Sequence, residues 1–419
     1  MGEATAGFGA PGEAIRPQFK PGRISLVWLA IRLSVLTILT FGLYRFWMAT
    51  NLRRYYWSAI TILGDPLEYT GTALEKLLGF LFALVILAVY LSLVNLGLAF
   101  VGLVSFDEPT GIEVQIILNL SILATLPLIF FATYRARRYI LARTRWRGIR
   151  FGMDQAAWAY TLHALPLVLL SGVSLGLLYP LQNFRLTKFK IDRTWFGDAP
   201  FHQGGRWTAL MRYWAWVWGL GLGLIAGLVF LLAQTGEQNL LAAGVFAMLG
   251  GLALAGMFVW YRVAAFRYFW SRRSVRGTHF QCDLSAAEII GIYFAGYIAV
   301  GFFAVVMAAV LTTLVATLWL MFAPIEQADA LWRLTEGHVD QNLAWPIFLL
   351  LAIAYLAAIA FSSALSHVFI TRPILRRQAE AMTIEASAEL SAVRQRAHDN
   401  AIEAGGFADA LGVDVGAGV

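Results

Sequence analysis

The chain has very little cysteine and few charged residues. Its single cysteine, Cys282, excludes an intrachain disulfide and any metal site built from several cysteines. Only 14% of the 419 residues are charged, 59% are hydrophobic, and the mean hydropathy is +0.67. Soluble domains carry about 25% charged residues. The composition therefore excludes a soluble globular domain and predicts a protein of the lipid bilayer.

Familiar nucleotide and metal motifs are also missing. The sequence has no Gly-x-x-x-x-Gly-Lys phosphate loop and no His-Glu-x-x-His pair. We predict no catalytic residue, no metal and no cofactor. The net charge of +7 does not indicate nucleic acid as a partner, because Lys and Arg cluster beside apolar segments, as in cytoplasmic loops of membrane proteins. The predicted partners are membrane lipids.

Six long apolar stretches are expected to cross the membrane as helices, because runs of 18 or more residues span a hydrocarbon core about 30 Å thick. Loops 105–113 and 234–239 contain no Lys or Arg, and loop 324–342 contains only Arg333, so all three are expected outside. This places both termini in the cytoplasm of a bacterial inner-membrane protein. The six stretches are 74–104, 116–134, 207–233, 240–261, 286–323 and 343–369.

Two further apolar stretches, 24–47 and 156–179, are interrupted. The first contains Arg32, and the second contains His163 and Pro166. Both flanks of each stretch are basic, and one crossing cannot leave both flanks inside. We predict re-entrant or interfacial helical hairpins here, since broken helices at membrane depth need protein or water around them. The alternative is eight crossings, with two repeats in opposite orientation, as in inverted-repeat transporters.

A basic motif occurs twice and indicates internal duplication. Residues 138–154 (RYILARTRWRGIRFGMD) and 267–283 (RYFWSRRSVRGTHFQCD) match at seven positions without a gap. The expected organisation is a flexible lead-in (1–22), a first membrane repeat (23–154), a second (155–283), a divergent third segment pair (284–371) and a cytoplasmic tail (372–419).

Four connectors share one plan, which is Thr or Ser, then Gly three or four residues later, then an aromatic residue. In the first, short alternating runs flank Gly64-Asp65-Pro66 and resemble a β-hairpin. We infer that all four connectors turn in the same way on the same side. The predicted class is an all-α polytopic bundle, internally duplicated, with short hairpin-like cytoplasmic connectors. The predicted turn residues are Gly64, Asp65, Gly148, Gly197, Asp198 and Gly277.

A few polar residues are candidates for a functional site. Arg32 and His163 are candidates for a substrate path, because ionisable residues inside apolar segments are functional by default. Snorkelling to head groups explains Arg32 equally well, and capping of freed backbone is the commoner role for such a histidine. Asp65 and Asp198 form a matched acidic pair, although forming turns is commoner for Asp. Candidates for lipid head groups are Arg53, Arg54, Arg138, Arg143, Arg147, Arg267, Arg272 and Arg276.

Several strings are similar to a known family. ARTRWRGIRFG at 142–152, GDPLEYTG at 64–71, FGDAPF at 196–201 and GFADALGVDV at 406–415 resemble the YjgN-like bacterial inner-membrane proteins. The resemblance runs from about Phe19 to the end of the chain and is weakest in the third segment pair. It implies an inner-membrane location and a multi-span fold. It implies no catalytic or binding residue, because the function of that family is unknown.

Three functions are compatible with this sequence. Transport or permeation of a small or amphipathic solute comes first, because of the duplication, the broken segments and Arg32 and His163. A non-transporting scaffold or lipid-interacting envelope protein comes second, because interfacial aromatic residues are abundant. An intramembrane enzyme acting on lipid comes last. Glycine-rich stretches 219–227 and 250–256 allow close helix contacts, which suits a compact bundle or a homo-oligomer.

Overall fold

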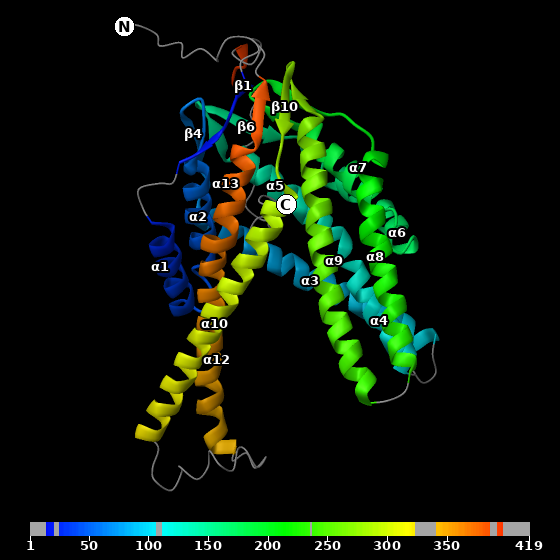
Figure 1. Cartoon of the computed structure of the whole chain (residues 1–419), viewed down its shortest axis with the longest axis vertical. Coiled ribbons are helices and arrows are strands. Elements are labelled where there is room, and N and C mark those ends of the chain that lie inside the picture. Colours follow the sequence, from blue (N-terminus) through cyan, green and yellow to red (C-terminus); the bar gives the residue numbers. More distant parts are fainter. Residues whose placement is uncertain are drawn as a thin grey trace. The chain divides into compact units, whose positions relative to one another are not determined.

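A computed structural model describes residues 14–20, 25–105, 111–234, 237–322, 341–385 and 392–396. The chain forms two compact units. Unit 1 consists of Met1–Pro21, Arg53–Ile290 and Arg376–Val419, and unit 2 of Gly22–Leu52 and Gly291–Leu375. All strands lie in unit 1. Figure 1 shows the helices and strands with the labels used below.

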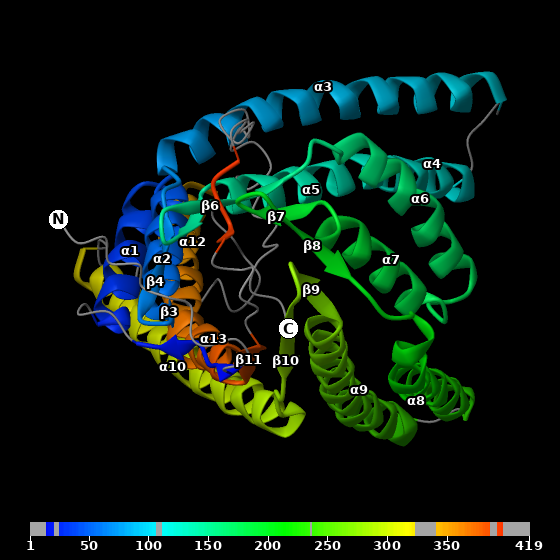
Figure 2. The same cartoon turned by 90° about the horizontal axis from the view of Figure 1, so that it is seen from above.

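Eleven strands in the described residues form one antiparallel sheet that closes into a ring. The strand order is β1-β11-β10-β9-β8-β7-β6-β5-β4-β3-β2. The two edge strands, β1 (Ala14–Ile15) and β2 (Gln18–Phe19), are separated by only two residues of chain. Ile15 pairs with Ile384 of β11, and Gln18 pairs with Thr61 of β3. This short segment therefore joins both edges, and the view from above looks onto the resulting ring (Figure 2).

Four β-hairpins, one from each connector, supply most of the ring. Leu63-Gly64, Arg147-Gly148 and Arg276-Gly277 have positive φ at both central residues, as type I′ turns require. In the remaining hairpin only the first central residue, Gly197, has a positive φ. The hairpins are β3 (Ile60–Ile62) with β4 (Asp65–Tyr69), β5 (Thr144–Trp146) with β6 (Ile149–Met153), β7 (Thr194–Phe196) with β8 (Ala199–Gln203), and β9 (Arg273–Val275) with β10 (Thr278–Cys282); β11 is Met382–Glu385.

The helices fill five insertions, each of which leaves the ring at one strand and returns at the neighbouring strand. Two insertions are short pairs, and three are long. The short pairs are α1 (Leu26–Leu39) with α2 (Arg45–Ala59), between β2 and β3, and α6 (Ala157–Val173) with α7 (Tyr179–Ile191), between β6 and β7. The long insertions hold α3 (Ala73–Ser105), α4 (Gly111–Ala124) and α5 (Leu126–Ala142); α8 (Thr208–Ala233) and α9 (Glu237–Ser271); and α10 (Ala286–Phe322), α12 (Gln341–Ser366), a π-helix (His367–Thr371) and α13 (Arg372–Glu380).

The same backbone hydrogen bond closes every insertion. The residue after the outgoing strand donates its N–H to the carbonyl of the residue at the end of the returning helix. The five donor–acceptor pairs are Lys20 to Ala59 (2.7 Å), Thr70 to Arg143 (2.9 Å), Asp154 to Arg193 (3.1 Å), Gly204 to Arg272 (2.8 Å) and Asp283 to Ala381 (3.0 Å). Each insertion thus starts and ends at one point of the ring wall.

The two short insertions turn back through nearly identical loops. Gly42 and Gly176, both with positive φ, donate to the carbonyls five residues earlier, and each distance is 2.7 Å. α1 has 14 residues and α6 has 17, so the two helices are about 21 and 26 Å long. Both lengths are less than the thickness of the hydrocarbon core. Their flanking strands pair directly, as Phe151 does with Phe196. A single crossing by either stretch is incompatible with this pairing, which argues against the eight-span alternative.

Six helices among the described residues are long and apolar enough to cross a membrane, which confirms the expected number. They fall in 73–100, 119–142, 208–233, 240–271, 286–314 and 354–380. The all-α class, in contrast, is only partly right, because the connectors join into a sheet. An isolated hairpin is marginal, and strands far apart in sequence supply the missing partners. Most of the predicted outer loops lie outside the described residues.

Within unit 2, α1 packs along α12. Leu26, Ala30 and Leu33 are buried and recur at helical spacing, so they form one face of α1. On α10, Gly296 lies against Ile370 of the π-helix, and a side chain at this glycine would collide with it. Small residues therefore allow the close packing of these helices.

We expect cysteine labelling to place the ring on the cytoplasmic side, because its hairpins are rich in arginine. His202, on β8, has a side chain that is 68% exposed. In a Cys282→Ser background, His202→Cys should react with an impermeant maleimide only after the cells are permeabilised. Glu237→Cys, beside a predicted outer loop, is the control and should react in intact cells. Labelling of position 202 from outside would contradict the predicted topology.

Candidate ring site

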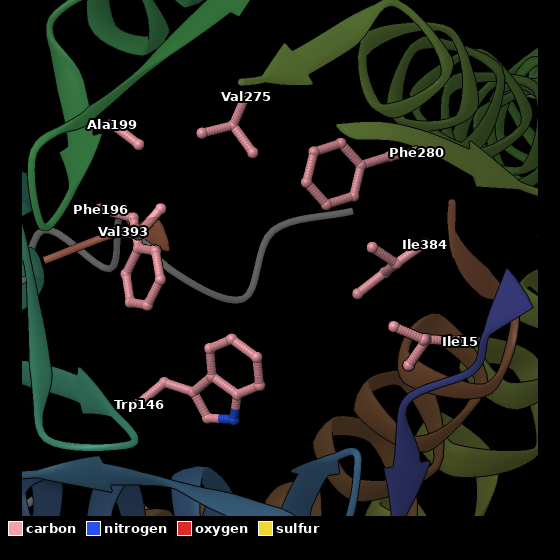
Figure 3. Packing of buried hydrophobic residues seen from close by; sticks show 8 residues of the cluster. All are labelled: Ile15, Trp146, Phe196, Ala199, Val275, Phe280, Ile384 and Val393. Atoms are coloured by element: carbon pink, nitrogen blue, oxygen red, sulfur yellow. The ribbon is translucent and has the colours of Figure 1, made fainter. Parts of the chain in front are cut away.

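The inner face of the ring is apolar. Alternate residues of each strand point inward, and seven of them form one buried cluster with Val393 of the C-terminal segment: Ile15, Trp146, Phe196, Ala199, Val275, Phe280 and Ile384. Figure 3 shows these side chains pointing toward one another across the interior. Trp146 lies 5.7 Å from Phe196, and Phe196 lies 4.7 Å from Phe151, between ring centroids. The interior therefore suits the apolar part of a molecule.

The chain supplies its own occupant for this interior. Eight strands make a barrel that wall side chains just fill, and an eleven-stranded barrel holds a central element. In this ring, the C-terminal segment 392–396 takes such a place. Val393 is 6% exposed and is the only one of the five residues that is buried. It lies beside Phe196 in the interior (Figure 3).

Polar contacts join the described C-terminal segment, 392–396, to β6 and to the turn between β7 and β8. Asp198 donates its N–H to the Arg394 carbonyl at 2.9 Å, and Arg394 donates its N–H to Asp198 Oδ1 at 3.1 Å. Gln395 accepts a hydrogen bond from the Arg150 N–H at 2.8 Å. A side chain at Gly197 would collide with the Arg394 carbonyl. The contact therefore depends on the Gly197-Asp198 turn.

The predicted turn residues lie at the tips of the hairpins, and the two aspartates link neighbouring hairpins. Asp65 binds Arg147, and Asp198 binds Arg276 at 2.7 Å. In each pair, the arginine comes from the turn of the next hairpin around the ring. Asp198 thus serves both the hairpin rim and the C-terminal segment.

Most of the predicted head-group arginines have partners within unit 1, and three are exposed, namely Arg54, Arg267 and Arg272. Arg147 and Arg276 bind the two turn aspartates. Arg267 and Arg272 are exposed and remain available to lipid. The other four have protein partners: Arg53 donates to the Tyr69 hydroxyl, Arg54 to the Gly71 carbonyl, Arg138 to the Met153 carbonyl and Arg143 to Glu75.

The two substrate-path candidates lie in different units. Arg32 is exposed on α1 in unit 2, and His163 lies in unit 1. His163 is half-buried and stacks on Phe189 at 5.5 Å; burial, with help from Arg185 and Arg193, lowers the pKa of its imidazole. Neither residue lines the open groove of about 470 Å³ beside α8 and α9, whose walls are apolar and include Trp214, Trp218 and Phe258.

A serine motif on the α6–α7 turn has a structural role. Residues 172–176 read Gly-Val-Ser-Leu-Gly, which matches the Gly-x-Ser-x-Gly elbow of hydrolases. That elbow requires a strand before the serine, whereas Ser174 follows a helix. Its hydroxyl donates to the Ser171 carbonyl at 3.0 Å and accepts the Leu178 N–H at 3.1 Å. Ser174 therefore caps the turn.

Three cations that the sequence did not single out lie where the helices join the ring. Arg273 is the first residue of β9 and faces inward like Val275 on the same strand; it is 9% exposed. Its guanidinium lies 4.0 Å from the ring centroid of Trp270. Arg137 of α5 has a buried Nε without a hydrogen-bond partner. Lys190 of α7 lies 5.8 Å from the Tyr160 ring. We call Arg137, Lys190 and Arg273 the basic trio.

The basic trio has no acidic partner among the described residues. Burial and the neighbouring charge of Arg137 lower the pKa of Lys190 to about 7 and that of Arg273 to about 9. Buried charge without a counter-ion is unfavourable, so such groups are rare unless they bind something. Sequence reasoning missed the trio because each member stands in a basic stretch. Arg273 stands at the inward-facing first position of its strand, where two other hairpins have Thr144 and Thr194. A comparison of the hairpin sequences could therefore have singled out this arginine.

These features define a polytopic membrane protein whose helices all depend on one closed strand ring. Residues 18–304 match the model of a family described as "Bacterial protein of unknown function (DUF898)", and the chain belongs to this family. The match confirms the resemblance to YjgN-like proteins, although it ends inside α10 rather than at the end of the chain. No curated protein and no solved structure matches the chain.

The low pKa of Lys190 predicts a pH-dependent stability. Between about pH 7 and the ordinary lysine value of 10.5, the unfolded chain holds a proton that the folded chain lacks. The free energy of unfolding therefore rises with pH in this window and is lowest below pH 7. Lys190→Met removes the buried charge, so it should raise the thermal midpoint more at pH 6 than at pH 9. The midpoints would be measured on protein in zwitterionic detergent.

Lys188→Met is the matched control on the same helix. Lys188 binds Asp192 at 2.9 Å and the Gln203 carbonyl at 2.6 Å, so its loss should lower the midpoint. The groups that act on or contact Lys190 include Arg137 of α5 and the ring of Tyr160 of α6. A lower midpoint for Lys190→Met at pH 6 would show that its charge is compensated after all.

Proposed function

We propose that this protein carries an amphipathic solute across or out of a bacterial inner membrane, and that the apolar part of the solute enters the strand ring. The observation that supports this most is the apolar ring interior, in which Val393 of a five-residue described segment of the same chain is buried. A wall of paired strands excludes water from such an interior, and apolar groups gain about 25 cal/mol per Å² on entering it. A displaceable occupant leaves room for a ligand.

The arrangement of charges supports the orientation that the proposal needs. Arginine-rich hairpins gather in the ring, and the loops between spans carry few or no basic residues, which favours a cytoplasmic ring and cytoplasmic termini. The recurring backbone hydrogen bond and the paired aspartate–arginine contacts support internal duplication. The short insertions then enter the membrane region without crossing it.

A non-transporting, lipid-interacting protein is the second candidate. It is favoured by the surroundings of the two substrate-path candidates, because Arg32 is exposed on α1 and His163 stacks on Phe189. The apolar groove beside α8 and α9 suits lipid chains as well. In this case the ring would hold a lipid without releasing it on the other side.

Transport should accelerate when the C-terminal segment leaves the ring. Val393→Asp places a carboxylate in an apolar interior at a cost of several kcal/mol, which disfavours the bound position. In proteoliposomes holding a fluorescent short-chain phosphatidylglycerol, we expect the wild type to move the probe between leaflets, as followed by dithionite quenching. Val393→Asp and a chain ending at residue 391 should both move it several-fold faster.

Ala392→Asp is the matched control, because it adds the same charge at an exposed neighbour. It should leave the rate unchanged. If the wild type and Val393→Asp both match protein-free liposomes, the transport proposal is wrong. Equal acceleration by Ala392→Asp would instead indicate a general effect of charge on the segment.

A further inference from the structure

The basic trio stands where helices lead into strands whose inward residues form the interior cluster. Arg273 shares its inward face with Val275, which belongs to the interior cluster. The Trp270 side chain, on which Arg273 stacks, packs against the same cluster. On the other side, Tyr160, beside Lys190, packs with Met153 at the end of β6.

We propose that the basic trio binds the phosphate of an anionic amphipathic molecule whose apolar tail lies in the ring. This inference rests on the proposed function and names the chemical class of its ligand. Arg137 and Arg273 provide planar forks of N–H donors that suit phosphate oxygens, and Lys190 adds a compact charge. Three basic side chains without a described acidic partner attract an anionic phosphate group.

The surroundings of the trio fit a ligand that enters and leaves. Arg273 is nine-tenths buried, and the buried Nε atoms of Arg273 and Arg137 both lack a hydrogen-bond partner. The side chains of Arg137 and Lys190 remain partly exposed, so an anion can reach the trio. The nearby aromatic rings of Tyr134 and Tyr160, 5.3 Å apart, form an apolar wall. The carboxylate of Asp154, which follows β6, accepts a hydrogen bond from Trp195 at 3.3 Å.

Binding measurements on the full chain in a non-ionic detergent test this proposal. The probes are dihexanoyl phosphatidylglycerol, inorganic phosphate and a neutral alkyl glucoside of similar tail length. We expect phosphatidylglycerol to bind, and Arg273→Gln and Lys190→Met to weaken its binding at least ten-fold each. The double variant Arg206→Gln with Arg212→Gln removes two exposed charges of the same unit and should change binding less than two-fold.

The remaining outcomes distinguish a lipid phosphate from free phosphate, and they distinguish binding at this site from transport. If inorganic phosphate binds in a trio-dependent way and phosphatidylglycerol does not, the ligand is a free anion and the amphipathic assignment is wrong. If the neutral glucoside binds as tightly as phosphatidylglycerol, the assignment of an anionic ligand is also wrong. Unchanged phosphatidylglycerol binding in both trio variants would overturn the site itself. If trio-dependent binding is found but no transport, the site stands and the proposed function fails. The thermal midpoint of each variant is measured as well, and a midpoint close to that of the wild type shows that the variant is folded when its binding is lost.

Discussion

Backbone pairing between strands that are distant in sequence is the constraint on which this structure depends. Each insertion must return to the strand next to the one it left, and the hydrogen bonds of Lys20, Thr70, Asp154, Gly204 and Asp283 close it there. A sheet cannot continue through a bilayer with open edges, so all strands share one side. Every insertion therefore crosses the membrane an even number of times or not at all. Topology, hairpin positions and the number of spans follow from this one requirement.

Closing the ring also solves the problem of exposed strand edges. An open sheet of strands only two to five residues long would present unpaired backbone groups at both ends. The segment from Ala14 to Phe19 removes both edges, because its first half pairs with β11 and its second half pairs with β3. The wide interior is a consequence of the number of strands. Val393 fills part of a space that the wall side chains leave, so closure and occupancy are physically linked.

Local features of this fold could be predicted from the sequence, whereas the ring could not. Gly64-Asp65-Pro66 and the Gly148 and Gly277 turns encode hairpins within a few residues, and apolar length encodes six spans. The interruption at Pro166 and the basic flanks also indicated a folded-back segment. Pairing of Ile15 with Ile384 joins positions that no local pattern relates. The all-α expectation failed for this reason, since short hairpins gain stability only when they find such partners.

The arginines that are candidates for binding are those that are buried without a hydrogen-bond partner. The sequence alone does not distinguish them from exposed or paired arginines in the same basic stretch. Arg272 and Arg273 are adjacent, but strand alternation exposes the first and buries the second on the inner face. Arg138 binds the Met153 carbonyl, while the neighbouring Arg137 keeps a buried Nε without a partner. A fold selected only for stability would place apolar or paired residues at such positions, because unpaired buried charge destabilises it. The basic trio is therefore better explained by a ligand than by the stability of the ring.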